Sequence, residues 1–195
     1  MLKTRYTIIL GSQSPRRKQL LEGLDIAFEV RVIEIDETIP TNIPQHTVAE
    51  YLAREKGKAH LSSMNDKELI ITSDTVVVCN QQILGKPANT DEAQAMLHLL
   101  SGKTHDVITG VCLTSKDKTV SFSDVTKVVF KDLTDAQINY YIDIYKPFDK
   151  AGGYGIQEWI GYTGIESIEG SYFNVMGLPV ARLSDVLFKE FGLGY

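Results

Sequence analysis

The stretch Leu10-Gly11-Ser12-Gln13-Ser14-Pro15-Arg16-Arg17-Lys18 follows directly on the apolar run Tyr6-Thr7-Ile8-Ile9-Leu10. The apolar run predicts a short buried strand. Ser14 is a favourable residue for the N-cap of a helix, and Pro15 suits the first helical position. The sequence therefore predicts a strand, a turn and a helix over residues 15–21 that ends before Gly23.

Arg16 and Arg17 fall in the first turn of this predicted helix, at the positive end of the helix dipole. Each cation there costs about 0.3–1 kcal/mol if nothing compensates it. A bound anion reverses the sign, because free backbone N–H groups, serine hydroxyls and two guanidinium groups would all face it. We therefore predict a polyphosphate site at this strand, turn and helix.

The composition is that of a soluble globular protein, with 43% hydrophobic and 23% charged residues among 195. This length suffices for one domain or two small lobes. The net charge of −5 argues against broad nucleic-acid binding, duplexes included, because such binding needs a basic face. No apolar stretch approaches 18 residues and no leader pattern is present, so we expect a cytoplasmic protein that does not enter a membrane.

Cysteine and histidine show no spacing that indicates a metal site or a nucleophile. Cys79 and Cys112 lie in apolar runs and are expected to be small buried side chains in a reducing compartment. The histidines are scattered and are expected to be structural or solvated: His46, His60, His98 and His105. Neither Ser12 nor Ser14 has a nearby histidine base in the sequence, and no G-x-S-x-G motif occurs, so a serine nucleophile is not favoured.

The remaining pattern predicts an α/β fold, with a mixed twisted sheet and flanking helices. Strands are predicted at residues 28–35, at 69–73 and 76–79 with Asp74-Thr75 between them, and as a hairpin at 105–114 and 119–129. Helices are predicted from a capping box at Thr47 to about residue 64, from a cap at Thr90 to Gly102, from a capping box at Thr134 to before Pro147, and over 180–191.

Two charged residues, Lys56 and Asp74, have both a structural and a functional interpretation, and Glu37 could act with them. Lys56 continues the apolar row Val48 and Leu52 at a spacing of four, so it is either a snorkelling lysine at the core edge or a cation that reaches a phosphate. Asp74 interrupts an apolar series, and it is either a turn residue or a magnesium ligand or general base. Glu37 could supply a second carboxylate, because magnesium typically takes one or two carboxylates plus phosphate oxygens and water.

Two further segments gain weight only if a nucleotide is bound. Lys86, in Leu84-Gly85-Lys86-Pro87, is either part of a surface turn or a further cation for the anion. Gln157 ends Ala151-Gly152-Gly153-Tyr154-Gly155-Ile156-Gln157, which is neither a Rossmann nor a Walker motif. Its glycines would let backbone approach a ligand closely, and its amide suits the O4/N3–H edge of uracil or thymine better than guanine.

Seven segments in this order carry a family resemblance. They are Gly11-Ser12-Gln13-Ser14-Pro15-Arg16-Arg17, Ala53-Arg54-Glu55-Lys56, Ser73-Asp74-Thr75-Val76-Val77, Gly85-Lys86-Pro87, Ser101-Gly102-Lys103-Thr104-His105, the segment that ends at Gln157, and Gly170-Ser171-Tyr172-Phe173-Asn174-Val175-Met176-Gly177-Leu178-Pro179. Together they resemble the Maf family of nucleoside triphosphate pyrophosphatases over nearly the whole chain.

The resemblance implies a single Maf-like domain over residues 1–195, with two lobes around an active-site cleft and a fold related to the inosine triphosphatase type. It implies a hydrolase acting on acid anhydrides, which cleaves a nucleoside triphosphate to the monophosphate and pyrophosphate with a divalent metal (Mg, Mn or Co). It also implies a homodimer. The ending Tyr-Gly-Ile-Gln is similar to the subgroup that acts on dTTP and UTP.

The resemblance also implies residue roles. The triphosphate-binding positions match Ser12, Arg16, Arg17, Lys56 and Lys86, and the metal-linked acidic positions match Glu37 and Asp74. Asp74 matches the proton acceptor, so Asp74, Lys56 and Glu37 are the expected catalytic group. Substrate choice is tied to Arg16, Thr75 and Gln157.

Two alternatives stay open at this point, a 7-methyl-GTP pyrophosphatase of the same fold and a non-catalytic nucleotide-binding regulator of cell division. The acidic residues disfavour the regulator, because carboxylates beside a polyphosphate make sense only with a metal. Two departures from the family are Gly11 and Gly57, both where alanine is usual. The second lowers local helix propensity by about 1 kcal/mol.

Overall fold

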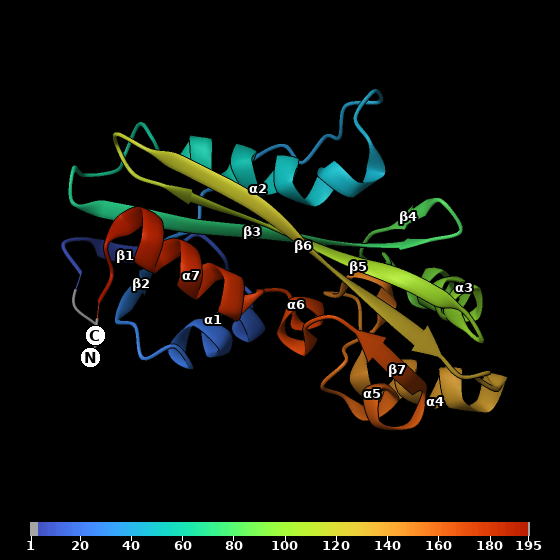
Figure 1. Cartoon of the computed structure of the whole chain (residues 1–195). Coiled ribbons are helices and arrows are strands. Elements are labelled where there is room, and N and C mark those ends of the chain that lie inside the picture. The colour runs from blue at the N-terminus through green and yellow to red at the C-terminus, as the bar shows by residue number, and fades with distance from the viewer. Residues whose placement is uncertain (1–3, 195) are drawn as a thin grey trace. The chain divides into compact units, whose positions relative to one another are not determined.

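The fold is organised around a seven-stranded mixed sheet, seen in a computed structural model that describes residues 4–194 (Figure 1). The sheet order is β2-β1-β3-β5-β6-β7, and β4 pairs with β3. The strands are β1 (Thr7–Leu10), β2 (Phe28–Val30), β3 (Glu68–Cys79), β4 (Gln82–Leu84), β5 (Thr104–Thr114), β6 (Thr119–Phe130) and β7 (Ile165–Glu169). β1 runs parallel to β2 and β3, whereas the β3–β4 and β6–β7 pairs are antiparallel, so the predicted mixed sheet is confirmed.

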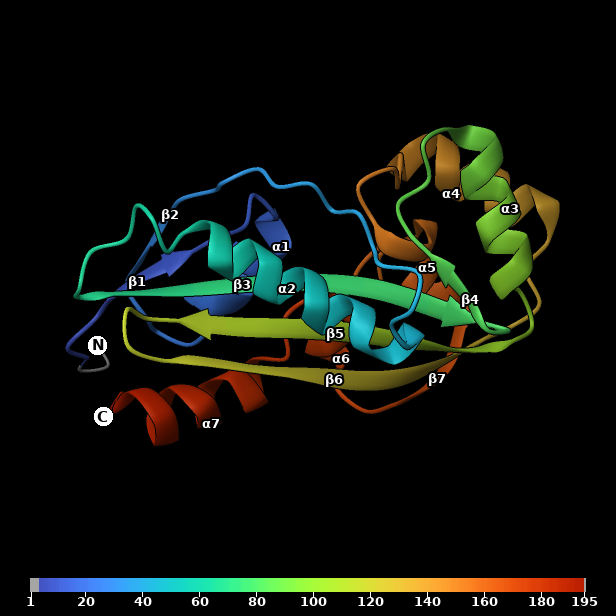
Figure 2. The ribbon, with the colours of Figure 1, turned by 90° about the horizontal axis from the view of Figure 1, so that it is seen from above.

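Seven α-helices and two short 3-10 helices are described alongside the sheet. The α-helices are α1 (Pro15–Glu22), α2 (Val48–Ala59), α3 (Thr90–Leu100), α4 (Asp135–Tyr145), α5 (Trp159–Thr163), α6 (Tyr172–Met176) and α7 (Val180–Phe191), and the 3-10 helices are Gln45–Thr47 and Ala151–Gly153. α2 and α7 lie on opposite faces of the sheet, and α1 is on the same side as α7 (Figures 1 and 2). No helix in residues 4–194 is both long enough and apolar enough to cross a lipid bilayer.

The chain divides into two compact units. The first consists of the described parts of Met1–Asp74, Thr109–Asp124 and Gly177–Tyr195, and the second of Thr75–Ile108 and Val125–Met176. The divisions fall inside β3, β5 and β6, so each of these long strands contributes residues to both units. Asp74 and Thr75 stand on either side of the division in β3.

The core of the first unit follows from the apolar runs of its parallel strands. Ile8 to Leu10 of β1 pair with Leu69 to Ile71 of β3, and all six side chains are at most 1% exposed. Strands covered on both faces are expected to be continuously apolar, as these are. The predicted closing helix is confirmed as α7, which buries Leu183, Leu187 and Phe191 on one stripe.

Two strand predictions are wrong. The predicted strand at residues 28–35 is limited to Phe28–Val30, and the chain then continues without regular structure to residue 40. The predicted break at Asp74-Thr75 is absent, because β3 is one continuous strand. The chain turns instead at Asn80 and Gln81, whose φ angles of 50° and 63° are typical of a two-residue hairpin turn between β3 and β4.

Two predicted side-chain caps are also wrong, although α2 does begin directly after Thr47. Thr47 has helical backbone angles and makes no side-chain cap, because its Oγ1 donates to the Pro44 carbonyl oxygen at 2.8 Å. Asn89, not Thr90, caps α3 by accepting the Glu92 N–H at 3.0 Å. The predicted helix to about residue 64 ends at Ala59.

Other local predictions are confirmed. The capping box at Thr134 is present, and α4 ends before Pro147. The strands β5 and β6 are neighbours joined through residues 115–118, as the hairpin pattern predicts. Cys79 and Cys112 are buried and free. The short elements α5, β7 and α6 have no counterpart in the sequence prediction.

Candidate active site

The turn between β1 and α1 is held by its own serines, of which Ser14 has the predicted role of N-cap. Ser14 caps α1, since its hydroxyl accepts the Arg17 N–H at 3.4 Å. Ser12 is buried, and its hydroxyl accepts the Ser14 N–H at 3.2 Å. A Cβ at Gly11 would lie 2.7 Å from Thr72 Cγ2, so a larger residue here would force the neighbouring strand to shift.

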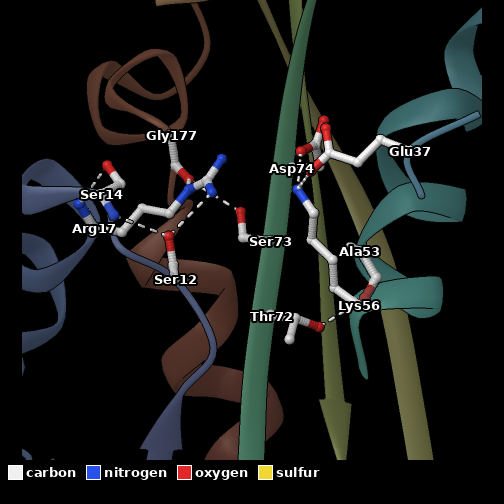
Figure 3. A network of polar contacts seen from close by, with 10 residues as sticks. All are labelled: Ser12, Ser14, Arg17, Glu37, Ala53, Lys56, Thr72, Ser73, Asp74 and Gly177. Atoms are coloured by element: carbon white, nitrogen blue, oxygen red, sulfur yellow. Dashed lines mark hydrogen bonds and ion pairs between the residues drawn. The ribbon is translucent and has the colours of Figure 1, made fainter. Parts of the chain in front are cut away.

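Arg17 points from the first turn of α1 towards the turn after α6 (Figure 3). Its Nε donates to the Gly177 carbonyl oxygen at 2.9 Å, and its guanidinium also donates to Ser12 Oγ at 3.3 Å. The same Gly177 carbonyl accepts Ser73 Oγ at 3.1 Å, and Gly177 has a φ of 111° that favours glycine. The Gly177 carbonyl and the Ser12 hydroxyl are both uncharged, and they fix the direction of the Arg17 side chain.

Lys56 forms a shared ion pair with two carboxylates (Figure 3). Its Nζ lies 2.5 Å from Asp74 Oδ1 and 2.8 Å from Glu37 Oε1. The side chains of Lys56 and Asp74 are 16% and 15% exposed, whereas that of Glu37 is 51% exposed. The expectation that Lys56 points to the edge of the core is confirmed, and Asp74 is a strand residue in an ion pair, not a turn residue.

The pleat of β3 separates these two groups of contacts. Ser73 and Asp74 are consecutive, so their side chains point to opposite sides of the strand, towards Arg17 and towards Lys56 (Figure 3). Thr72 points to the same side as Asp74 and donates to the Ala53 carbonyl oxygen at 2.6 Å, which ties α2 to the strand.

A close approach of α2 to the sheet accounts for the second glycine departure. A Cβ at Gly57 would lie 2.8 Å from Thr114 Oγ1 and 3.3 Å from Cys112 Sγ. The missing methyl group therefore lets the helix that carries Lys56 pack directly on β5.

Charge connects the two sides of β3. Burial lowers the pKa of Arg17, and the negative charge of Asp74 raises it in part. The positive charge of Arg16 lowers the pKa of Arg17 further, and the negative charge of Glu37 raises it. An arginine keeps its proton under these conditions. The charged Arg17 therefore interacts with Arg16 and with the two carboxylates that also hold the Lys56 ammonium.

The two carboxylates fit a metal ion only together with a ligand. Asp74 and Glu37 both direct an oxygen at one point, which the Lys56 ammonium occupies. In residues 4–194 no group of three or more histidine, cysteine, aspartate or glutamate side chains could hold a metal alone. Magnesium often uses one or two carboxylates and completes its shell with phosphate oxygens and water. The donor set therefore suits an ion that binds with a polyphosphate.

The second unit contains the other three predicted site residues, Thr75, Lys86 and Gln157. Lys86 is exposed on the loop after β4. This loop is linked to the glycine-rich loop, because the Gly152 N–H donates to the Gly85 carbonyl oxygen at 2.9 Å. A main-chain hydrogen bond therefore connects the segment around Lys86 to the loop that precedes Gln157.

Gln157 carries an unusual polar atom. Its Oε1 is buried and has no hydrogen-bond partner among the described residues. A buried acceptor without a donor costs about 1–3 kcal/mol. A ligand N–H would supply the missing donor, which is what the sequence analysis expects of uracil or thymine N3–H.

Several residues of the two units were not predicted from the sequence. In the first unit, Gly177 accepts hydrogen bonds from Arg17 and Ser73, and both Gly177 and Ser73 lie in segments that carry the family resemblance. Tyr141, Lys150 and Glu158 form a buried network beside Gln157. Lys150 and Glu158 could have been found from the sequence, because they are charged residues at the two ends of a glycine-rich loop. No sequence pattern indicates a role for Tyr141.

The buried histidines are structural, as expected. His60 packs at the end of α2, and burial lowers its pKa. His105 Nε2 lies 2.8 Å from the Tyr154 hydroxyl, and burial lowers its pKa to about 4. Both rings are therefore neutral near pH 7.

Comparison with known proteins gives a consistent picture. Residues 7–190 match a family model described as Maf-like protein. The chain is 58% identical over 180 residues to a dTTP/UTP pyrophosphatase of Parabacteroides distasonis, with 92% of this chain and 93% of the relative covered. A dTTP/UTP pyrophosphatase of Phocaeicola vulgatus is 55% identical over 186 residues, with 95% and 96% covered.

One solved structure shows the same fold at low sequence identity. A HAM1 protein from Coxiella burnetii aligns with a TM-score of 0.54 and 16% identity, over 94% of this chain and 99% of that one. This similarity confirms the predicted fold class.

Proposed function

The chain belongs to the Maf-like protein family, and we propose that it hydrolyses nucleoside triphosphates, dTTP and UTP above all, to the monophosphate and pyrophosphate. The single observation that supports this most is the arrangement in the first unit. There the Arg17 guanidinium lies within electrostatic reach of Asp74, whose carboxylate shares the Lys56 ammonium with Glu37. Cations for a triphosphate and carboxylates for a metal thus occur side by side.

We assign the triphosphate to the cationic residues. Arg16, Arg17, Lys56 and Lys86 would bind its oxygens, and the Ser12 hydroxyl would add a hydrogen bond. Because Lys56 is paired with carboxylates, its ammonium would have to exchange one of them for a phosphate. These same groups would stabilise the negative charge that develops on the leaving pyrophosphate. Electrostatic stabilisation of this kind is usually the largest contribution to the rate enhancement.

We propose that Asp74 and Glu37 hold a divalent cation (Mg, Mn or Co) together with the triphosphate. Such an ion would stabilise negative charge on the phosphate oxygens. Asp74 would also accept the proton of the attacking water. The water oxygen forms a bond to the α-phosphorus, the bond from that phosphorus to the bridging oxygen breaks, and pyrophosphate leaves with the electron pair.

We propose that Gln157 reads the base, and that Arg16 and Thr75 contribute to substrate choice. The buried Gln157 Oε1 would accept N3–H of uracil or thymine, and its NH2 group would donate to O4. The names of the two relatives, which specify dTTP and UTP, agree with this assignment.

The test is a substrate panel. Purified protein is given Mg²⁺, Mn²⁺ or Co²⁺ and dTTP, UTP, CTP, GTP or 7-methyl-GTP, and pyrophosphate and orthophosphate are measured separately. We expect pyrophosphate as the first product, fastest with dTTP and UTP, and none after chelation of the metal. Orthophosphate as first product would contradict attack at the α-phosphorus, preference for 7-methyl-GTP would favour the related pyrophosphatase, and binding without turnover would favour a regulator.

Three further expectations from the sequence belong to this proposal. We propose that residues 1–195 act as one Maf-like domain, since β3, β5 and β6 pass through both units. We also propose a homodimer, which light scattering of the purified protein would test. A cytoplasmic location stays a prediction, which cell fractionation would test.

A further inference from the structure

The second unit holds a buried polar network that the roles above do not use. Lys150 is 8% exposed, and its Nζ lies 2.7 Å from Asp149 Oδ1 and 3.1 Å from Glu158 Oε1. Tyr141 of α4 is fully buried, and its hydroxyl donates to the second carboxylate oxygen of Glu158. The same hydroxyl accepts the Gly155 N–H at 2.9 Å. A buried lysine is costly unless it is paired, and these contacts pair it.

This network closes the loop that carries Gln157. Lys150 precedes the loop and Glu158 follows it, so their ion pair joins its two ends. Gly155, inside the loop, is fixed to α4 through Tyr141. A Cβ at Gly155 would lie 2.9 Å from the Glu158 carboxylate carbon and 3.1 Å from Lys150 Cε, so the ion pair packs directly on the loop backbone.

The first half of the loop is held by other means. Gly152 and Gly153 both have φ angles of 70°, and the Gly152 N–H is bonded to Gly85. The Tyr154 ring lies 4.9 Å from that of Phe130, in an edge-to-face contact. The second half of the loop, which ends at Gln157, is held instead by the Tyr141 hydroxyl, which bonds the Gly155 N–H and the Glu158 carboxylate.

Discrimination between uracil and cytosine demands a fixed amide. Uracil presents an acceptor and an N–H, whereas cytosine presents a donor and a bare nitrogen at the same two positions. A glutamine amide can serve either base if it moves or turns over, because it carries a donor and an acceptor. A reading group must therefore be held close to its productive position by neighbours that are themselves locked.

We propose that Tyr141, Glu158 and Lys150 are positioning residues that hold the second half of this loop, and with it Gln157, so that the enzyme selects uracil and thymine over cytosine. The proposal rests on the proposed function, in which Gln157 reads the base. None of the three positioning residues contacts the substrate in this assignment. Burial and the bond to Glu158 raise the pKa of Tyr141, which keeps its hydroxyl a donor.

The experiment compares two hydroxyl deletions on the same helix. Tyr141→Phe removes the anchor of Gly155 and Glu158. Tyr145→Phe is the control, because the Tyr145 ring stacks on that of Tyr141 at 5.1 Å but its hydroxyl makes no contact with this loop in the described residues. KM and kcat are measured for UTP and CTP, together with competitive inhibition by inorganic tripolyphosphate, which has no base.

For Tyr141→Phe we expect a rise in KM for UTP of about 10-fold and a fall in the UTP-to-CTP ratio of kcat/KM of about 10-fold. Inhibition by tripolyphosphate should stay within about 2-fold, because the cations of the first unit are unchanged. Tyr145→Phe should match the parent in all three measurements. An unchanged UTP-to-CTP ratio, or an equal loss of affinity for UTP and tripolyphosphate, would overturn the positioning role.

Glu158→Gln gives a second, independent variant. It leaves Lys150 with Asp149 alone, and we expect it to lower the UTP-to-CTP ratio in the same direction as Tyr141→Phe. If it loses activity but keeps that ratio, the network has only a structural role. Failure of the parent protein to cleave UTP or to prefer it over CTP would instead contradict the proposed function, so the two failures can be told apart.

Discussion

In the first unit the polar side chains that we assign to the substrate bind one another, whereas in the second unit Gln157 has a buried oxygen that finds no donor within residues 4–194. Lys56 is shared between Asp74 and Glu37, and Arg17 is oriented by carbonyl and hydroxyl groups. The Gln157 loop has its own separate ion pair, between Lys150 and Glu158.

This difference follows from what each region is proposed to bind. A triphosphate and a metal ion are themselves charged. When they bind, an ion pair within the protein can be replaced by ion pairs with the ligand, so no charge is left buried and unpaired. A base brings only hydrogen-bonding groups, and its recognition needs an amide that is already in place. Substitutions of Asp74 and Arg17 in the first unit should therefore change turnover and triphosphate affinity, and substitutions in the Gln157 loop of the second unit should change base preference.

The largest effect is expected for Asp74→Asn. Because the amide cannot accept the proton of the attacking water, kcat should fall by at least about 1000-fold, while UTP still binds. Turnover is measured as pyrophosphate release, and binding by calorimetry. Asp66→Asn, at an exposed turn residue, is the control. Near-normal turnover by the Asp74 variant would remove this residue from the chemistry.

The next effect is expected for Arg17→Lys, which keeps the charge but loses the planar fork that donates to both Gly177 and Ser12. KM should rise about 10- to 100-fold for every nucleoside triphosphate, and inhibition by tripolyphosphate should weaken equally. The UTP-to-CTP ratio should stay constant, which is the reverse of the pattern for Tyr141→Phe. Lys18→Gln, on the exposed side of α1, controls for the loss of a nearby charge. A shift in base preference would contradict the division of roles.

Gln157→Glu should have a smaller effect, confined to the base. A carboxylate accepts hydrogen bonds but cannot donate to O4, and it suits the N1–H and amino donors of guanine. The ratio of kcat/KM for UTP to that for GTP should therefore fall, by about 10-fold or more. Gln94→Glu, on a helix of the same unit, is the control. If the preference for pyrimidine triphosphates survives unchanged, Gln157 does not read the base.

The sequence was a good guide where a short segment determines its own structure. The cap at Ser14, the capping box at Thr134 and the apolar stripe of α7 each arise from residues within one helix. Arg16 and Arg17 became candidates for a similar reason, because a cation in the first turn of a helix is unfavourable without a ligand.

The sequence was a poor guide where distant residues decide the outcome. β3 passes through Asp74 without a turn, and the carboxylate pairs there with Lys56, 18 residues away in the sequence. β2 is short although its sequence would allow more strand, and β7 forms through pairing with β6. Tyr141 and Glu158 are separated by 17 residues, and only the fold brings them together.

Buried histidines and the Glu68 carboxylate should make stability depend on pH in two different ranges. Burial lowers the pKa of His105 from 6.5 to about 4, so the unfolded chain takes up this proton first and stability is lost as the pH falls from about 6.5 to 4. Hydrogen bonds from Arg31 lower the pKa of Glu68 from 4.5 to about 2, so its contribution is present above pH 4.5 and is lost as the pH falls towards 2.

Two variants distinguish the pH range in which His105 affects stability from the range in which Glu68 does. His105→Gln can still bond the Tyr154 hydroxyl. It should flatten the decline in the free energy of unfolding between pH 6.5 and 4. Part of the decline should persist in this variant, because burial also lowers the pKa of His60. Glu68→Gln should lower stability at pH 7 by about 1–3 kcal/mol and flatten the decline below pH 4.5. Urea unfolding at a series of pH values measures both. A decline in the Glu68 variant as steep as in the parent below pH 4.5 would show that other carboxylates, not the pair with Arg31, govern acid unfolding.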